Sequence, residues 1–211
     1  MKTQTPLYQA HITKTINCPQ CGDALPIHFK WTKLVQCASC KSSIFLEDDS
    51  VKLIGKSSAL SPEPSLLKLR EPIRIDGKTY LPLGKIRYSY GRGFWEEWFL
   101  LDENNREFWL SVDEGDFVLE TKAKITLPFH NIDKLSVGKQ YGKYIVTEMG
   151  EGECVGFEGE LPENISIGDL HRYAHLSEGG SSLMTIEATS SGMKVFTGNW
   201  IDAFSIERVY G

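Results

Sequence analysis

Hydrophobic and polar residues alternate over short distances along most of the chain, and this pattern predicts β-strands rather than helices. From Leu66 onward, short runs rich in Tyr, Trp, Phe, Val, Ile and Thr are separated by turns that contain Gly, Asp and Asn. The stretch Ile165–Leu176 comes closest to helical spacing, and a short helix there stays open. The predicted strands are Thr79–Leu83, Lys85–Tyr90, Phe94–Leu101, Glu107–Ser111, Phe117–Glu120, Tyr144–Glu148, Cys154–Phe157, Leu183–Ala188, Lys194–Thr197 and Ser205–Val209.

The turns between these strands indicate the fold class. Asp102–Arg106 (D-E-N-N-R) predicts a hairpin turn, because Asn tolerates positive φ. A short echo, G-K-T-Y from Gly77 and G-K-Y from Gly142, precedes two of the strands and leaves two related β subdomains or chance similarity open. Many short strands with frequent turns are typical of a barrel or a sandwich. We therefore predict a mostly β protein, with an all-β barrel- or sandwich-like domain as its larger part.

Four of the five cysteines form two closely spaced pairs near the N-terminus. Fifteen residues separate Cys18 and Cys21 from Cys37 and Cys40, which is the spacing of four-cysteine zinc sites. Two residues between thiols let one tight turn direct both sulfurs at a single ion, and Gly22 suits such a turn. A redox C-x-x-C motif or two disulfides are the alternatives. The lack of a secretory signal favours zinc over both.

The expected metal has a structural role and defines the first domain. Four thiolate ligands leave no open coordination position, so the predicted Zn²⁺ is structural rather than catalytic. A module of under about 40 residues buries too little surface to fold alone, and metal ligation supplies the deficit. The remaining Cys154 is predicted to be a buried small side chain. We place a zinc ribbon at residues 11–48, a Ser- and Pro-rich linker at 49–65 and the all-β domain at 66–211.

Composition and charge narrow the range of partners. The chain has no uncharged apolar run of about 18 residues and no apolar N-terminal signal region, so we expect a cytoplasmic protein without membrane insertion. The net charge of −5 argues against general binding of polyanions. Basic and acidic residues balance in the ribbon, which argues against a nucleic-acid partner. They are Lys14, Lys30, Lys33 and Lys41 against Asp23, Glu47, Asp48 and Asp49.

Aromatic residues concentrate in one part of the chain. Ten of the 23 aromatic residues lie between Tyr80 and Phe117, and the densest segment is F-W-E-E-W-F-L-L. On a strand, Trp95 and Glu97 share one face while Trp98 lies on the other. Both faces are apolar and each carries a glutamate, so we expect a central strand that is covered on both sides.

A carboxylate among aromatic neighbours is costly unless it is paired or protonated. One interpretation is a structural ion pair with Arg87 or Arg92, which lie one strand earlier. The other is a recognition groove in which an aromatic wall and Glu97 bind a cationic group. A catalytic acid is less favoured, because no second polar group with a clear role stands nearby in the sequence.

Five blocks of sequence lie along the β region: G-K-I-R-Y-S-Y, G-F-W-E-E-W-F-L-L, F-W-L-S-V-D-E-G-D-F-V-L, Y-I-V-T-E and E-G-E-L-P. Together they resemble a bacterial family, the domain of unknown function family 4178, over roughly Leu66 to Trp200. Members often carry an N-terminal four-cysteine ribbon, as this chain does. The family's pattern falls on Tyr88, Trp95, Glu97, Trp98, Trp109, Leu110, Ser111, Gly115, Glu148, Glu158, Gly159, Glu160, Leu161 and Pro162.

The resemblance implies a context rather than an activity or a substrate. By gene company, the family is generally linked to polyamine-synthesis-like enzymes, small membrane proteins and phage-shock-type membrane-stress proteins. Where related chains tend to have an acid after Y-A, this chain has His175, so the polar role of that position is open.

Two histidines form the remaining candidate cluster. His171 and His175 would share a face on either a helix or a strand, but no third metal ligand lies nearby in the sequence, and we expect a solvated pair. Walker-type, G-x-S-x-G and H-E-x-x-H motifs are absent, and no catalytic residue is predicted.

We therefore expect a non-enzymatic, zinc-binding accessory protein of bacteria that binds a protein partner, in a membrane-stress or polyamine-linked system. Trp95, Trp98 and Trp109 are the predicted anchors for that partner. The alternative is an enzyme or sensor that binds a small cationic molecule such as a polyamine, with Glu97 and Glu160 as anionic contacts. Whether the aromatic stretch is core or binding surface stays open.

Overall fold

The structure, a computed structural model of the chain, describes residues 11–47, 50–56, 60–127, 129 and 131–209. The described residues are mostly β-strand, which confirms the predicted fold class. Their helical segments are two short 3-10 turns, η1 (Ile132–Lys134) and η2 (Ala203–Ser205). None of the helical segments in these ranges has the length or the apolar character needed to cross a bilayer.

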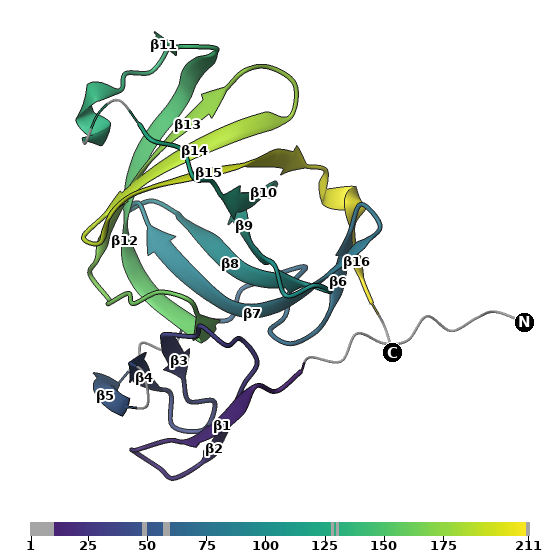
Figure 1. The fold of residues 1–211 in the computed structure, drawn as a ribbon, viewed down its shortest axis with the longest axis vertical. Coiled ribbons are helices and arrows are strands. Elements are labelled where there is room, and N and C mark those ends of the chain that lie inside the picture. The colour runs from purple at the N-terminus through teal and green to yellow at the C-terminus, as the bar shows by residue number, and fades with distance from the viewer. Residues whose placement is uncertain (1–10, 48–49, 57–59, 128, 130, 210–211) are drawn as a thin grey trace, which may run out of the picture.

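Eight antiparallel strands close into a barrel (Figure 1). Their order around the barrel is β7-β8-β9-β10-β15-β14-β13-β12, and β12 completes the ring by pairing with β7. A barrel of this size has an interior just wide enough for packed side chains or one small ligand. The strands are β7 (Lys78–Ser89), β8 (Phe94–Asp102), β9 (Glu107–Asp113), β10 (Asp116–Lys122), β12 (Tyr144–Leu161), β13 (Leu170–Ser177), β14 (Ser182–Thr189) and β15 (Gly192–Ile201).

The barrel consists of two four-stranded meanders, β7–β10 and β12–β15. A short strand introduces each one: β6 (Ile73–Ile75) forms a hairpin with β7, and β11 (Gln140–Tyr141) forms one with β12. The echo in the sequence coincides with these hairpins, where Gly77 and Gly142 have positive φ. The first strands of the two halves pair with each other, and so do the fourth strands. The two related segments are therefore halves of one barrel.

The seam between β7 and β12 depends on glycine. A Cβ on Gly159, where φ is +75°, would lie 2.1 Å from the carbonyl oxygen of Leu83, and a Cβ on Gly84 would lie 2.1 Å from that of Glu160. Only glycine permits this approach of the two backbones. The close contact lets the ring of strands close at this position.

Apolar side chains cover the outer surface of the barrel as well as filling part of its interior. On the first half they pack against residues 66–75 and β16 (Ile206–Arg208), with Leu67, Ile73 and Trp98 all nearly fully buried. On the second half, the segment around η1 covers β13, β14 and β15, and Ile132 is 1% exposed there. This double packing explains why strands such as β8 are apolar on both faces.

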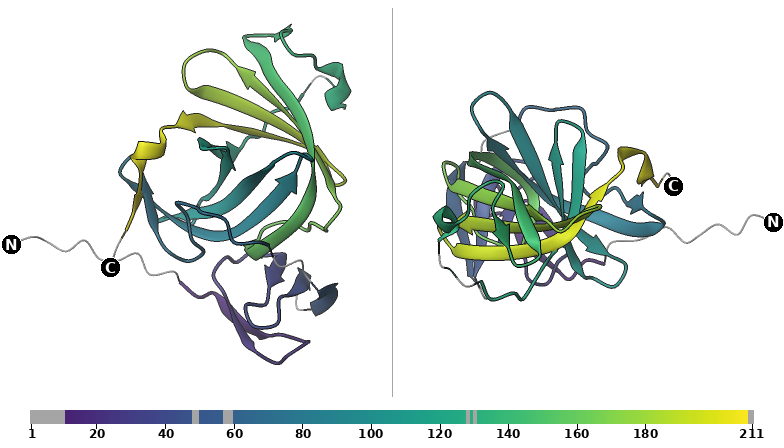
Figure 2. Two further views of the ribbon diagram at one scale, coloured as in Figure 1. Left: turned by 180° about the vertical axis from the view of Figure 1, so that it is seen from behind. Right: turned by 90° about the horizontal axis from the view of Figure 1, so that it is seen from above.

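The N-terminal module lies at one end of the barrel, as Figures 1 and 2 show. Its strand β3 extends the barrel sheet by pairing with the end of β12, with Val35 opposite Glu160. Of the predicted linker 49–65, residues 50–56 form β5, while residues 49 and 57–59 lie outside the described residues. The module contains β1 (Lys14–Asn17), β2 (Ala24–Ile27), β3 (Leu34–Gln36), β4 (Ser42–Glu47) and β5 (Ser50–Lys56).

The structure decides one question of secondary structure that the sequence leaves open. The short helix left open at Ile165–Leu176 is not formed, and most of that stretch belongs to β13. Ala174 and Leu176 point outward into the apolar layer under η1, while His171 and Tyr173 point into the barrel. The polar residues thus face inward, which hides the alternation that usually marks a strand.

Candidate functional site

The four paired cysteines come together as a group that could hold a metal ion. The sulfur atoms of Cys18, Cys21, Cys37 and Cys40 all lie within 4.8 Å of one another. Two of the separations are 3.6 Å (Cys18–Cys40) and 3.7 Å (Cys21–Cys37). Tetrahedral Zn–S bonds place sulfurs about 3.8 Å apart, so the donor set fits such an ion.

Each cysteine pair lies in the same kind of turn. The amide of Gly22 donates to the carbonyl of Cys18, and the amide of Lys41 donates to that of Cys37, at 2.8 and 2.9 Å. Gly22 has φ +79° as expected, and Lys41 adopts φ +60° at the equivalent position. Cys154 lies elsewhere, fully buried in the barrel, where burial raises the pKa of its thiol to about 12.

Glu160 fastens the module to the barrel. Its side chain is fully buried and accepts hydrogen bonds from the backbone amides of His28 and Phe29, from the hydroxyl of Thr32 and, at 2.6 Å, from the ring of His28. A buried carboxylate with this many donors is structural. Glu160 therefore has a structural role, which differs from the ligand contact predicted for it together with Glu97.

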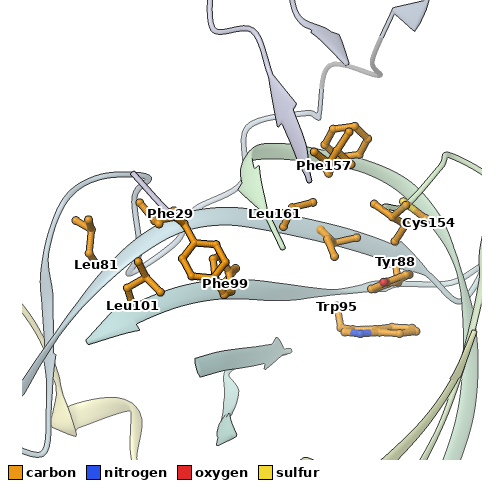
Figure 3. Close-up of a cluster of buried hydrophobic side chains, with 13 residues drawn as sticks. Phe29, Leu81, Tyr88, Trp95, Phe99, Leu101, Cys154, Phe157 and Leu161 are labelled. Atoms are coloured by element: carbon orange, nitrogen blue, oxygen red, sulfur yellow. The ribbon is translucent and has the colours of Figure 1, made fainter. Parts of the chain in front are cut away.

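The module also closes one end of the barrel. Phe29 enters the interior and packs edge-on against Phe99, with ring centroids 5.2 Å apart (Figure 3). Leu81, Leu101 and Leu161 belong to the same buried cluster. The part of the interior nearest the module is thus solid apolar core.

The predicted aromatic anchors occupy three different environments. Trp98 is 2% exposed in the outer apolar layer of the barrel, and Trp95 is 5% exposed inside the barrel. Trp109 is half-buried and contacts Phe99 at 5.4 Å between ring centroids. The three tryptophans therefore do not form one surface groove, because Trp95 and Trp98 are buried on opposite faces of β8 and Trp109 is half-buried.

The adjacent glutamates of β8 have opposite surroundings. Glu96 faces outward and accepts hydrogen bonds from the Arg87 guanidinium (2.6 Å) and the Lys85 ammonium (3.2 Å). Glu97 faces the interior, where the Trp95 indole and the Ser111 hydroxyl both donate to its Oε1, at 3.1 and 3.0 Å. Glu96 thus forms a structural ion pair with Arg87, whereas Glu97 accepts hydrogen bonds from two neutral donors.

Glu97 lines a small cavity in the polar half of the barrel interior, with a volume of about 80 Å³. Its wall contains six carboxyl groups and two histidines but no lysine or arginine. A cavity of this size holds a few waters or the end of a slender ligand. The lining residues are Trp95, Glu97, Ser111, Asp113, Asp116, Val118, Glu120, Glu148, His171, Tyr173, His175, Thr185, Glu187 and Trp200.

Burial and mutual repulsion disfavour the charged form of the innermost carboxyl groups. Burial, and then the charge of Glu120, raise the pKa of Glu97 to about 8. Burial and the charge of Glu97 hold the pKa of Glu187 well above its ordinary value. Burial also raises the pKa of Glu120, although Thr185 donates a 2.6 Å hydrogen bond to it. A cation inside the cavity would reverse this effect, because it stabilises the ionised carboxylates.

The two histidines line the same cavity rather than forming a solvated pair. His171 is 4% exposed, and its Nδ1 has no hydrogen-bond partner among the described residues. Burial, followed by the charge of His175, lowers the pKa of His171 to about 4, so the ring is neutral near pH 7. His175 lies 3.5 Å from Glu148 at the rim. An unpartnered, buried ring nitrogen beside a polar cavity marks a position where a ligand or water would bind.

Aromatic rings complete the wall. Trp95 stacks on Tyr88 at 5.0 Å between centroids and meets Tyr173 edge-on at 5.5 Å. A Cβ on Gly152 would lie 2.4 Å from the Trp95 ring, so glycine is required beneath it. Carboxylates with aromatic faces form the combination that binds alkylammonium groups.

Among the residues that line this cavity, Glu97 and Trp95 were predicted candidates, whereas Glu120, Glu187 and the inward position of His171 were not predicted. Glu120 and Glu187 each stand at inward positions of otherwise apolar strands, and that signal was present in the sequence. It could not be interpreted without knowing that β10, β13 and β14 turn their polar faces to one interior.

Fold and site together define a class: a closed eight-stranded β-barrel with an acidic, aromatic-lined cavity, joined to a four-cysteine module. The chain belongs to the family described as "Domain of unknown function (DUF4178)", which matches residues 69–203. The matched region covers the whole barrel and leaves out the cysteine module. No curated protein and no solved structure matched the chain.

Proposed function

We propose that this protein is a binding protein whose barrel takes the cationic end of a small amine in its acidic cavity. The observation that carries the proposal is the lining itself, with six carboxyl groups and no lysine or arginine around about 80 Å³. Trp95 and Tyr173 supply ring faces for the alkyl part next to the ammonium group.

The cavity volume limits the ligand to a slender chain. Bulky ligands usually occupy pockets of about 300 Å³ or more, which is well above the space here. A primary alkylammonium fits this limit, and a linear polyamine presents such a group at its end. The gene company of the family, which includes polyamine-synthesis-like enzymes, makes spermidine the first ligand to try.

The test is thermal denaturation with a matched panel of ligands. Spermidine, putrescine and butylammonium should raise the melting temperature, because a ligand that binds only the folded state stabilises it by mass action. The uncharged isostere 1-butanol should not. Glu97→Gln should remove most of the shift, whereas Glu103→Gln makes the same charge change at an exposed turn and should keep it. An equal shift of the melting temperature with 1-butanol, or with spermidine in Glu97→Gln, would contradict the proposal.

In the N-terminal module we propose a structural Zn²⁺ held by Cys18, Cys21, Cys37 and Cys40. Four thiolate donors at tetrahedral spacing support zinc, and the closed ligand set supports a folding role. Metal analysis of the purified chain should give one zinc per chain. Cys37→Ser should abolish zinc binding, whereas Cys154→Ser, at a buried position outside the cluster, should leave the zinc content unchanged.

A second candidate function, as an adaptor for a protein partner, rests on the outer strand of the module. β5 ends the sheet order and carries the exposed side chains Val51 and Leu53, 38% and 42% accessible. Trp31 of the same module is 62% exposed. Such an edge is a template for an added strand.

Affinity capture from the native host tests the adaptor role. The natural chain should retain a stoichiometric protein, and Leu53→Lys should lose it. Equal capture by both would contradict the adaptor role.

A further inference from the structure

A larger hollow of about 590 Å³ lies at the end of the barrel opposite to the acidic cavity, which is the end nearest the N-terminal module. The strands β9 and β10 show that the two sites are at opposite ends. Asp113 and Asp116, which flank the connecting turn, line the acidic cavity, while the other ends of both strands line this hollow. The module contributes Lys33 to its wall. We name it the basic mouth; it is lined by Lys33, Arg106, Glu107, Trp109, Thr121, Lys122, Pro162, Glu163, Asn164, Ser191, Lys194 and Phe196.

Cations exceed carboxylates in the basic mouth by four to two. Arg106 is paired with Asp102, and Lys194 is paired with Glu163. Within the described part of the chain, Lys33 and Lys122 make no ion pair with a carboxylate. An anion would therefore find two ammonium groups that form no ion pair within the described residues, and a third in a partly buried pair.

The lysines are close enough to affect one another. Burial, and then the charges of Lys122 and Lys33, lower the pKa of Lys194 to about 8. The side chain of Lys194 is only 17% exposed. Burial raises the pKa values of Glu107 and Glu187, and the charge of Lys122 partly offsets this effect on both carboxyl groups. The repulsion among the three lysines is the effect that a bound anion would relieve.

The remaining wall favours an organic anion over a bare inorganic one. Trp109 and Phe196 offer aromatic surface, and Pro162 adds an apolar edge. Asn164, Ser191 and Thr121 provide neutral hydrogen-bonding groups at the same hollow. The volume falls within the range of pockets that bury small organic molecules, about 300–1,000 Å³, and such pockets often lie between domains.

We propose that the basic mouth binds an aromatic anion, with its carboxylate or phosphate held by Lys33, Lys122 and Lys194 and its ring against Trp109 and Phe196. The site is shared between the module and the barrel. The proposal does not rest on the amine site, although the charge of Lys122 acts on Glu187 in the acidic cavity.

The probe for the test is 1-naphthyl phosphate, titrated calorimetrically into the full chain. Lys33→Glu and Lys122→Glu should each weaken binding at least tenfold, because each replaces an attracting charge with a repelling one. Lys14→Glu makes the same charge change on the exposed strand β1, outside the mouth, and should leave the affinity within about twofold. Both mouth lysines are exposed, so the variants should keep the thermal denaturation profile of the natural chain.

Three results would overturn the proposal. One is the absence of binding to the natural chain at millimolar probe. The second is an unchanged affinity in either mouth variant, or an equal loss in Lys14→Glu. The third is equally tight binding of uncharged 1-naphthol, which would indicate a merely apolar contact.

Discussion

At the scale of single residues, Glu96 and Glu97 show how the alternation of side chains along a strand determines the environment of a carboxyl group. The sequence predicts one glutamate on each face of the strand, and the structure agrees. Which glutamate receives the cations could not be predicted, because the answer depends on a bulge between Pro82 and Gly84 in β7. The bulge shifts the alternation so that Lys85 and Arg87 meet Glu96 on the outer face, leaving Glu97 with neutral donors.

The buried state of Glu97 predicts a specific effect of pH on stability. Its pKa of about 8 in the folded chain is above the ordinary value of 4.5, so folding is favoured by this group below pH 4.5 and loses that contribution as pH rises toward 8. Glu97→Gln keeps an acceptor for Trp95 and Ser111 but cannot ionise. The variant should therefore exceed the natural chain in unfolding free energy by at least about 1 kcal/mol at pH 8.

Urea denaturation at pH 8 and at pH 5 measures this difference. The advantage of Glu97→Gln should shrink at pH 5, where the natural glutamic acid is also protonated in the folded state. His171 works in the other direction, since its lowered pKa makes stability fall as pH drops from 6.5 through about 4. Because both chains contain His171, its contribution cancels in the comparison. A pH-independent difference would contradict the buried, uncharged state of Glu97.

At the scale of elements, most strands of the barrel were predictable, and β13 was not. Its neighbours Leu183–Ala188 and Lys194–Thr197 carry runs of apolar and β-branched residues that mark them as strands. In β13 the inward positions are His171, Tyr173 and His175, which have a meaning only inside a polar interior. Similarly, the single strand β12 was predicted as two short ones, because the glycines between them resemble turns but serve close packing instead.

The seam between β7 and β12 predicts an unusually damaging glycine substitution. Gly159→Ala adds a Cβ at 2.1 Å from the carbonyl of Leu83, in addition to the strain of φ +75°. Gly138 has a similar φ of +82° with nothing within 4 Å of its Cβ, so Gly138→Ala reports the strain alone. Gly159→Ala should lower the unfolding free energy by about 2 kcal/mol more than Gly138→Ala in urea denaturation. Equal losses would mean that the seam relaxes easily.

At the scale of the whole molecule, the sequence predicts two parts but not how they join. The cysteine spacing and the strand pattern are local, whereas closure of the barrel depends on pairing between residues as distant as Ser89 and Glu153. The insertion of Phe29 into the barrel also cannot be predicted from the residues near it in the sequence. These contacts make the module a plug for one end of the barrel.

This arrangement predicts that metal loss reaches the barrel. Chelation of the proposed Zn²⁺ should unfold the module and withdraw Phe29 from its place beside Phe99, and so lower the melting temperature of the barrel by several degrees. Scanning calorimetry before and after chelation measures the shift. In Phe29→Ala the barrel already lacks the plug, so chelation should change its melting temperature much less. A barrel transition that is unaffected by chelation in the natural chain would contradict the plug.

The central claim is that a cation replaces protons on the carboxyl groups of the cavity. Calorimetric titration of spermidine at pH 7 in two buffers with different ionisation heats tests it most directly, because the difference between the buffers counts the protons released. We expect saturable binding with release of about one proton or more per ligand, and a smaller release in Glu97→Gln. A flat titration, or binding without proton release, would contradict it.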